Sequence, residues 1–273
     1  MIESKRLPAI GGTVPSAMLY KASAQEILAD PAALPDESID LVLTDPPYVI
    51  SKPSGFRNLG ADGQFQGDPR FAIHTDFGQW DHTDGFSLSD LGEVIGSLYR
   101  VLRPGGTVIV FFDLWKATAL ADMLAAAEFE KVRMAEWLKT NAVPINSRAT
   151  YLNNARETAV VAHKPGPQTY CPTSTTGIYR HPIHHGRDRF HPTQKSLTLF
   201  EELVGIHCRA GDRVLDCFSG SATTGVAALR RGCSYVGCEP DPTYFDRSFS
   251  RLEETHNKLR EAGRAQHDTG TPA

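Results

Sequence analysis

The sequence predicts an α/β fold in which strands of a sheet alternate with helices. Two observations lead to this class. Short apolar runs alternate along the chain with segments whose apolar residues recur at helical spacing. One of the runs also leads into a loop of small residues, and in an open α/β sheet such a turn lies at the carboxyl ends of the strands, where ligands bind.

The composition is that of an ordinary globular protein, with 273 residues, 41% hydrophobic and 22% charged. No run of about eighteen apolar residues exists, which excludes a membrane-spanning helix. The first fifteen residues lack the apolar stretch of a secretory signal, so we expect the protein in the cytoplasm. Five scattered cysteines, an odd number, indicate reduced thiols and not a disulfide framework.

The first half of the chain is predicted to hold three strands and two helices. The strands are expected at 39–44, 107–112 and 132–138, and the helices at 89–102 and 114–127. The first strand must end at Asp45, because Pro46 and Pro47 cannot continue a sheet ladder. Residues 103–106, Arg-Pro-Gly-Gly, are expected to turn the chain after the first helix. Residues 53–84 have no period and are expected to form a long functional loop.

The second half of the chain is also predicted to alternate between helices and strands. Helices are expected at 196–208, 223–231 and 242–259, strands at 213–217 and 235–238, and a frayed tail from Ala262. Between the two halves, 157–163 is a single strand candidate. The three tryptophans, Trp80, Trp115 and Trp137, are expected to be packing residues, although Trp80, in the long loop, could touch substrate.

Charge is unevenly distributed along the chain. The net charge is −4, but residues 139–195 carry eight lysines and arginines against two acids. This segment can therefore meet phosphates while the rest of the chain does other work. The candidates for contact with phosphate or guanine edges are Lys139, Arg148, Arg156, Arg180, Arg187 and Arg189. A solvated loop face is the alternative for any one of them. The histidines of this segment fit no zinc spacing, so we expect no metal.

The segment Asp216-Cys-Phe-Ser-Gly-Ser-Ala-Thr-Thr-Gly225 is the first candidate site. Small residues let the backbone approach a nucleoside, and the helix that follows offers free N–H groups. The next strand ends at Glu239, whose carboxylate can accept hydrogen bonds from ribose hydroxyls, while Thr193 and Lys195 can hold a ligand carboxylate. A structural turn without ligand is the alternative. The absence of Gly-x-Gly-x-x-Gly argues against a nicotinamide dehydrogenase.

The second candidate site is Asp45-Pro-Pro-Tyr48. Prolines remove N–H donors, so the Asp45 carboxylate and the Pro46 carbonyl are two acceptors side by side. The Tyr48 ring adds a flat apolar face on which a base can stack, an interaction worth roughly 1–3 kcal/mol. Two acceptors and a stacking ring suit a planar base with an exocyclic amino group. The alternative is a rigid loop whose aspartate caps a helix.

Three motifs together resemble the amino-group DNA methyltransferases. They are Asp45-Pro-Pro-Tyr48, His191-Pro-Thr-Gln-Lys195 and Asp216-x-Phe-x-Gly-Ser-x-Thr-Thr224, and their order resembles that of the beta class. Phe77-Gly-Gln-Trp-Asp81 is similar too. The likeness runs from about Tyr20 to Leu252. It implies a Rossmann-like S-adenosylmethionine-dependent sheet with circularly permuted motif order and a small inserted target-recognition region.

The resemblance also implies a division of the chain and roles for its residues. The parts are an N-terminal extension (1–17), a catalytic half (18–138), a target-recognition region (139–190), a cofactor-binding half (191–260) and a flexible tail (261–273). Asp45, Pro46, Pro47 and Tyr48 would form the catalytic base site. The cofactor would contact Asp45, Thr193, Lys195, Asp216, Phe218, Ser219, Gly220, Ser221, Thr223, Thr224 and Glu239. Departures from the family pattern are Cys217 in place of Pro, Ala222 in place of Gly, and Ala22-Ser23 in place of Gly-Asp.

The expected reaction is methyl transfer from S-adenosylmethionine to the N6 amino group of adenine in a base flipped out of duplex DNA. In the family, Asp-Pro-Pro-Tyr goes mostly with adenine, but the N4 of cytosine stays open, and so do RNA adenine and a protein amide. A recognition module without catalysis is a further alternative, against which the intact motif speaks. A homodimer and a cognate restriction endonuclease are expected as partners beside the DNA.

Overall fold

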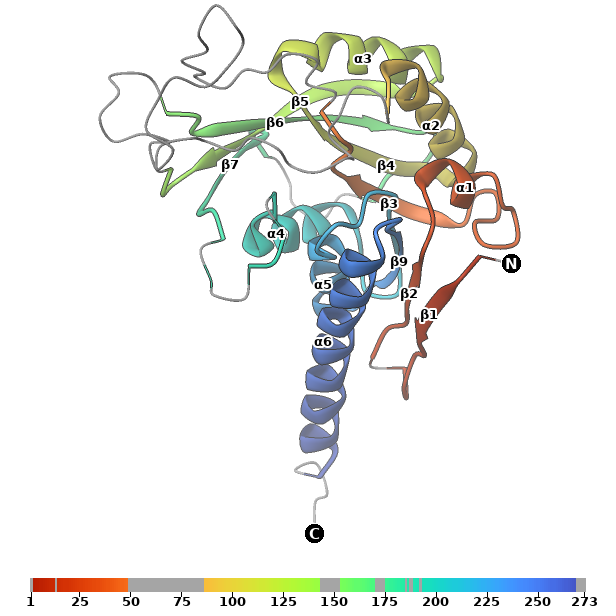
Figure 1. Ribbon diagram of the computed structural model, residues 1–273, viewed down its shortest axis with the longest axis vertical. Helices are drawn as coiled ribbons and strands as arrows, with labels where there is room; N and C mark the ends of the chain where they lie inside the picture. Colours follow the sequence, from red (N-terminus) through yellow and green to blue (C-terminus); the bar gives the residue numbers. More distant parts are fainter. Residues whose placement is uncertain are drawn as a thin grey trace, which may run out of the picture.

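One mixed β-sheet lies at the centre of the molecule (Figure 1). The computed structural model describes residues 2–12, 14–48, 86–142, 153–169, 175–184, 186, 189–191 and 193–268. Along the chain, the strands are β1 (Ser4–Leu7), β2 (Ala17–Tyr20), β3 (Ile39–Thr44), β4 (Leu102–Phe112), β5 (Glu130–Lys139), β6 (Arg156–His163), β7 (Ile178–His181), β8 (Arg213–Asp216) and β9 (Ser234–Cys238). Their order across the sheet is β1-β2-β9-β8-β3-β4-β6-β5-β7. This arrangement confirms the predicted α/β class.

Helices cover both faces of the sheet, and a separate buried apolar cluster lies under each layer. The layer shown uppermost in Figure 1 comprises α1 (Ala24–Leu28), α2 (Leu88–Val101) and α3 (Ala117–Ala126), which follows the 3₁₀ turn η3 (Leu114–Lys116). The other layer comprises α4 (Leu197–His207), α5 (Thr223–Arg230) and α6 (Pro242–Asp268). Within the described residues, no helix combines the length and the apolar character that crossing a membrane requires.

The central strands are apolar on both faces because both faces are covered. Leu41, Val42 and Leu43 of β3 are each 0% exposed, although successive side chains point to opposite sides of the sheet. Polar side chains then fix where helices begin. Ser23 and Glu26 form a capping box at α1, so the Ser23 that departs from the family pattern has a local structural role.

The strand directions create the crevice where a ligand can bind. β2, β9, β8, β3 and β4 are parallel neighbours. The chain leaves β8 through α5 to β9 on one side, whereas β3 connects through α2 to β4 on the other. The strand order therefore reverses between β8 and β3, and open α/β sheets bind ligands outside the carboxyl ends of their strands at such a point. The loops that follow Thr44 and Asp216 both lie there.

One reversed strand brings the basic segment to the same edge. β6 runs antiparallel to β4, so Thr158 near its beginning pairs with Phe112 at the end of β4. β5 is antiparallel to β6, and β7 is parallel to β5. The start of β6 and the ends of β5 and β7 thus meet the carboxyl ends of the parallel strands.

Several predicted boundaries differ from the structure. β4 begins at Leu102 and includes the Arg-Pro-Gly-Gly segment, where Gly105 at φ +80° bends the strand without ending it. β1, β2 and β7 are too short to show a period in the sequence. α6 continues to Asp268 where a frayed tail from Ala262 was predicted, because Arg, Glu, Ala and Gln of this segment favour a helix. The predicted loop at 53–84 lies outside the described residues.

Candidate active site

Asp45 follows β3 directly and presents two carboxylate oxygens in different environments. Its Oδ2 lies 3.0 Å from the Nζ of Lys195, a residue that precedes α4. Its Oδ1 is buried and has no hydrogen-bond partner among the residues that the structure describes. A buried acceptor without a partner costs stability, so an unpaired oxygen in a binding crevice is a sign of a missing ligand donor.

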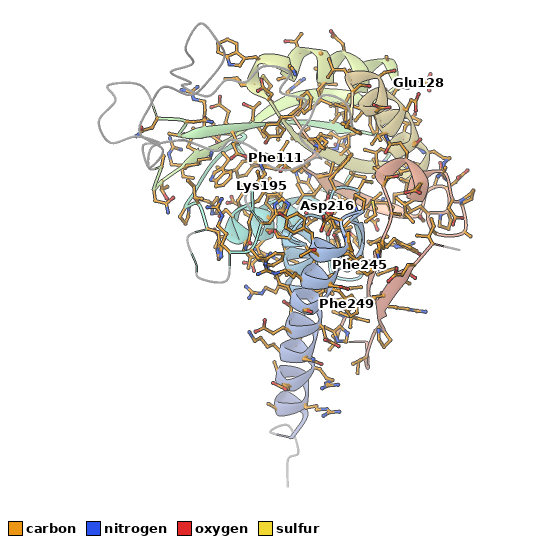
Figure 2. All side chains as sticks on the ribbon, in the orientation of Figure 1. Phe111, Glu128, Lys195, Asp216, Phe245 and Phe249 are labelled. Atoms are coloured by element: carbon orange, nitrogen blue, oxygen red, sulfur yellow. The ribbon has the colours of Figure 1, made fainter. Side chains whose placement is uncertain are left out.

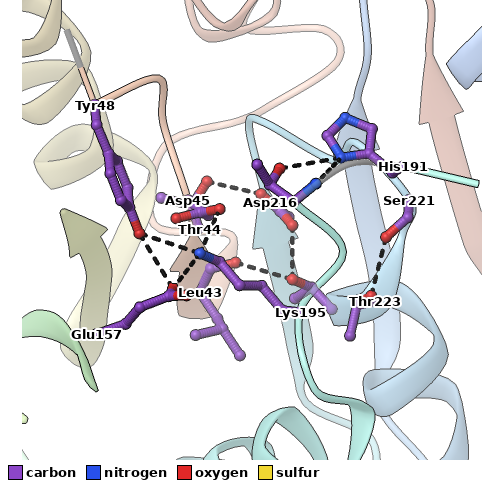
Figure 3. A network of polar contacts seen from close by, with 12 residues as sticks. Leu43, Thr44, Asp45, Tyr48, Glu157, His191, Lys195, Asp216, Ser221 and Thr223 are labelled. Atoms are coloured by element: carbon purple, nitrogen blue, oxygen red, sulfur yellow. Dashed lines mark hydrogen bonds and ion pairs between the residues drawn. The ribbon is translucent and has the colours of Figure 1, made fainter. Parts of the chain in front are cut away.

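Lys195 connects the Asp45–Tyr48 loop to β6 (Figure 3). Its Nζ donates to Oε2 of Glu157 at 2.5 Å and to the Tyr48 hydroxyl at 3.1 Å. The other Glu157 oxygen, Oε1, lies 2.7 Å from Nζ of Lys139 on β5. Two lysines and two carboxylates therefore balance one another in a site that is largely shielded from water. Figure 2 shows Lys195 and Asp216 between the two helix layers.

Burial and charge shift the two carboxyl groups in opposite directions. Burial raises the pKa of Asp45 to about 6, although Lys195 opposes the rise; Glu157 adds to it. Burial alone would raise the pKa of Glu157 as well, but Lys195 and Lys139 together lower it to about 2. Glu157 is thus a fixed negative charge, whereas Asp45 titrates close to neutral pH.

Asp216 fixes the turn at the end of β8 beside the Asp45 loop. Its Oδ1 accepts from the Thr44 hydroxyl at 2.7 Å and the Phe218 N–H at 3.1 Å, and its Oδ2 accepts from the Thr224 hydroxyl at 2.6 Å. The Thr224 hydroxyl oxygen also lies 3.2 Å from the Leu43 carbonyl oxygen. The end of β3, from which the Asp45–Tyr48 loop starts, is therefore hydrogen-bonded to the turn after β8. Oδ1 of Asp216 makes this link, and its Oδ2 accepts from Thr224 within the turn.

The rest of the turn is held by short polar contacts. Ser221 and Thr223 hydroxyls lie 3.1 Å apart, and the Ser219 hydroxyl lies 2.9 Å from that of Tyr235. Gly220 has φ +50°. Ala222 also adopts the left-handed region, with φ +55° and ψ +34°, at the position where the family has glycine. An L-residue there costs about 1–2 kcal/mol, so the substitution strains the turn.

Glu239 closes the far side of the turn. Its carboxylate accepts from the Gly220 N–H at 2.9 Å and the Asp241 N–H at 3.0 Å. Burial raises its pKa to about 7 in spite of these two bonds. The ring of His191 lies over Gly220: a Cβ atom at position 220 would be 3.4 Å from Nε2 of His191. The Thr193 hydroxyl lies 3.1 Å from Nδ1 of the same histidine.

Comparison with known proteins agrees with this geometry. The profile of a family described as DNA methylase, named for N6 and N4 methyltransferases, matches residues 39–250. The chain belongs to this DNA methylase family. The methylase is 28% identical over 235 residues to the Type II methyltransferase M2.DpnII of Streptococcus pneumoniae, covering 80% of this chain and 83% of that protein.

Two solved structures share the fold. The M1.HpyAVI–SAM complex superposes with a TM-score of 0.62 at 26% identity, covering 86% of the methylase and 99% of that chain. The cytosine-N4-specific PvuII DNA methyltransferase has the same TM-score at 17% identity, over 90% and 93% of the two chains. The methylase thus has the Rossmann-like fold of the S-adenosylmethionine-dependent DNA methyltransferases, with S-adenosylmethionine as its cofactor.

The donor set at the crevice fits this cofactor. Glu239 directly follows β9 and has a carboxylate able to accept from ribose hydroxyls, and Gly220 leaves the turn without a side chain. Phe218 is half-buried beside the turn and packs edge-on against Phe86 at 5.4 Å. Lys195, for which the resemblance predicts a contact with a carboxylate of the cofactor, bridges Asp45 and Glu157 in the structure.

The basic residues separate onto two faces of the sheet. Arg156 of β6 and Arg180 of β7 both align with Leu138 of β5, so they share one face, and both side chains are exposed. Lys139, the next residue of β5, points to the other face and pairs with Glu157. It was predicted to bind DNA, but it is largely buried. Arg189 is exposed, and Arg148 and Arg187 lie outside the described residues.

Two residues of the site region were missed or misread in the sequence. Glu157 is not among the site residues predicted from the sequence, although an acid at the start of a strand in a basic segment is the available signal. Trp115 was predicted to pack, but its side chain is 91% exposed just after β4 ends. Trp137 is buried as predicted, and Trp80 lies outside the described residues, as does Phe77-Gly-Gln-Trp-Asp81.

Proposed function

We propose that the methylase transfers a methyl group to the N6 amino group of adenine in DNA, on a base rotated out of the duplex. The observation that carries this proposal is Oδ1 of Asp45, which has no partner among the described residues, together with the carbonyl group of the next residue, Pro46. An exocyclic amino group has two N–H bonds, and these two oxygens are acceptors for them. A base inside the duplex cannot enter such a buried site, so it must be flipped.

The residues of the loop make the amino nitrogen a better nucleophile. Its lone pair is delocalised into the ring, and two acceptors that bind both N–H groups favour a pyramidal nitrogen with a localised lone pair. S-adenosylmethionine, when bound, supplies an electrophilic methyl group on its sulfonium. Once the nitrogen carries the methyl group it must lose one proton. Asp45 Oδ1 is the acceptor for that proton, which suits a carboxyl group whose pKa burial raises to about 6.

Tyr48 supplies the stacking surface for the flipped base. Its ring packs edge-on against Phe112, with centroids 6.0 Å apart, and Lys195 holds its hydroxyl. The orientation of the ring is therefore set before a base arrives. Preorganisation of this kind removes the entropic cost of ordering the ring during binding.

The exposed residues at the same edge are candidates for DNA contact. Arg156, Arg180 and Arg189 offer positive charge to the phosphates. Trp115 is exposed, and the next residue in the chain, Lys116, donates to the Tyr48 carbonyl at 3.4 Å. We infer that the Trp115 ring stacks against a DNA base close to the flipped nucleotide. The target-recognition role of residues 139–190 stays part of this proposal.

Cytosine N4 is the second candidate substrate, because its amino group also presents two N–H bonds and the PvuII enzyme, which is cytosine-N4-specific, has the same fold. Radiolabelled S-adenosylmethionine and mixed-sequence duplex DNA, followed by nucleoside analysis, separate the two. We expect N6-methyladenine. N4-methylcytosine as the only product would contradict the proposal, and a parallel RNA reaction tests the RNA alternative.

Further partners follow from the same proposal. M2.DpnII and M2.LlaDCHI are named Type II methyltransferases. Their names support the proposal that this methylase protects DNA from a restriction endonuclease with the same recognition site. A homodimer remains a proposal, and sedimentation of the methylase with and without DNA tests it. Cys208, Cys217, Cys233 and Cys238 are buried and form no disulfide among the described residues, in keeping with work in the reducing cytoplasm.

A further inference from the structure

Four charged side chains are buried together beside the base site, and the proposed reaction uses only one of them. The exposed fractions are 11% for Lys139, 18% for Glu157, 9% for Lys195 and 19% for Asp45. Removing charges from water costs several kcal/mol per ion, and apolar side chains would fill the same space at no such cost. A buried network of this size at a reactive loop therefore points to a functional role.

Glu157 is the centre of this network. Its Oε1 holds Lys139, and its Oε2 holds Lys195 at 2.5 Å. Through Lys195 it acts on Oδ2 of Asp45, and the Tyr48 hydroxyl lies 3.4 Å from the same Oε2. The Glu157 carboxylate on β6 thus contacts Tyr48 at one end of the Asp45–Tyr48 loop and is linked through Lys195 to Asp45 at the other end.

We propose that Glu157 is a positioning residue that, through Lys195, holds the Asp45–Tyr48 loop so that Oδ1 of Asp45 is open to the substrate amine. The inference rests on the proposed function of Asp45 as an acceptor. It assigns Lys195 to the base site and not to the methionine end of the cofactor. It also gives a role to Lys139, whose charge keeps Glu157 ionised and in place.

The electrostatic surroundings of Asp45 give this role a measurable signature. The titratable groups that face it are Lys195 from the segment before α4, Glu157 from β6 and Tyr48 from its own loop, with Lys139 one contact further away. Asp216 of β8 lies behind Thr44, to which it is hydrogen-bonded. Lys195 lowers the pKa of Asp45 and Glu157 raises it. Removing the charge of Lys195 should therefore raise the pKa of Asp45, and removing the charge of Glu157 should lower it.

The test is the pH dependence of single-turnover methyl transfer at saturating cofactor and DNA. In the wild type we expect the rate to fall as pH drops through about 6, because protonated Asp45 no longer accepts from the amine. In Glu157→Gln this acidic limb should move down by about 0.5–1 pH unit, and in Lys195→Met it should move up by a similar amount. The maximal rate of Glu157→Gln should fall roughly 10- to 100-fold, since the acceptor and the ring lose their support.

Two further variants separate positioning from folding. Glu201→Gln, which removes a partly buried glutamate paired with Arg230 on the far helix layer, is the matched control and should leave the limb unchanged. In Glu157→Gln, Lys139 is left without its carboxylate, which is expected to lower stability. The double variant Lys139→Met/Glu157→Gln removes that buried charge, so it should recover thermal stability while keeping the shifted limb and the low rate.

The outcomes are distinct for each idea. Opposite shifts in the Glu157 and Lys195 variants support the inference. An unshifted limb in Glu157→Gln, or a rate that returns with stability in the double variant, overturns it. If the wild type yields N4-methylcytosine, the proposed substrate is wrong while the limb test still applies. If the wild type methylates no nucleic acid, the proposed function itself fails.

Discussion

Both oxygens of Asp216 accept hydrogen bonds within the cofactor turn and from β3, whereas Asp45, on the neighbouring loop, has one oxygen with no partner among the described residues. The turn is held by hydroxyls and backbone groups, and the Asp45–Tyr48 loop is held by charges. Thr44, the residue before the Asp45–Tyr48 loop, donates to Asp216 at the start of the turn.

This difference separates a structural carboxylate from a reactive one. A buried carboxylate whose two oxygens both accept hydrogen bonds from the protein stabilises the fold and has less capacity left for a ligand. A buried carboxylate that is half satisfied costs stability and is ready to bind a donor. Asp216, on the cofactor side of the crevice, therefore stabilises the fold, whereas Asp45, on the base side, is available to bind a substrate donor.

The largest expected effect is on the base side. Asp45→Ala removes the acceptor of the amine proton, so methyl transfer should fall by at least about 10³-fold. Binding of S-adenosylmethionine, measured by calorimetry, should change little, and the free energy of unfolding should stay within about 1 kcal/mol, because Asp45 is a desolvated group with one ion pair. Transfer at a rate near that of the wild type would refute the assignment.

The second-largest effect is expected for Asp216, the carboxylate on the cofactor side, and concerns the stability of the fold. Asp216→Ala leaves the hydroxyls of Thr44 and Thr224 and the N–H of Phe218 without their acceptor. We expect the free energy of unfolding to fall by about 2–4 kcal/mol in urea denaturation. A loss of stability no larger than that of Asp45→Ala would remove the distinction between the two carboxylates.

A smaller effect is expected at the exposed rim of the base site. Trp115→Ala should raise the KM for DNA roughly tenfold, the value of one lost base-stacking contact, and leave the affinity for S-adenosylmethionine unchanged. Trp115→Phe, which keeps an aromatic face, should retain most of the DNA affinity. Equal KM values for the wild type and the alanine variant would show that the ring does not touch DNA.

The smallest effect concerns the protonation of Glu239. Its pKa in the free protein is raised to about 7, and hydrogen bonds from ribose hydroxyls favour the ionised form. Cofactor binding must therefore displace a proton below pH 7, and the Kd should rise roughly fivefold from pH 7 to pH 6. Glu239→Gln should bind more weakly at pH 8 but without this dependence. A pH-independent Kd in the wild type would argue against the ribose contact.

The sequence was informative where contacts are local. Asp216, Gly220, Thr224 and Glu239 lie on one strand-turn-helix-strand unit, so their proximity follows from the alternation of elements. The pairing of Thr44 with Asp216 follows once the strand order is known.

The Asp45–Lys195–Glu157 network was not predictable in this way. Its members lie on separate elements: Lys195 and Tyr48, whose hydroxyl Lys195 binds, are 147 residues apart in the sequence. Glu157 reaches the carboxyl edge of the sheet only because β6 runs antiparallel to β4. Side chains alternate between the two faces of β5, and Lys139 lies on the face that holds Glu157. The composition of the segment does not predict this orientation. Ion pairs have no spacing rule along the chain, so they require the fold.

The most direct test is a crystal structure of the methylase with S-adenosylhomocysteine and a duplex that contains its methylated site. We predict an adenine outside the duplex, stacked on Tyr48, with its N6 about 3 Å from Oδ1 of Asp45 and from the Pro46 carbonyl. A base amine bound elsewhere, with Oδ1 of Asp45 turned to Lys195, would contradict the account.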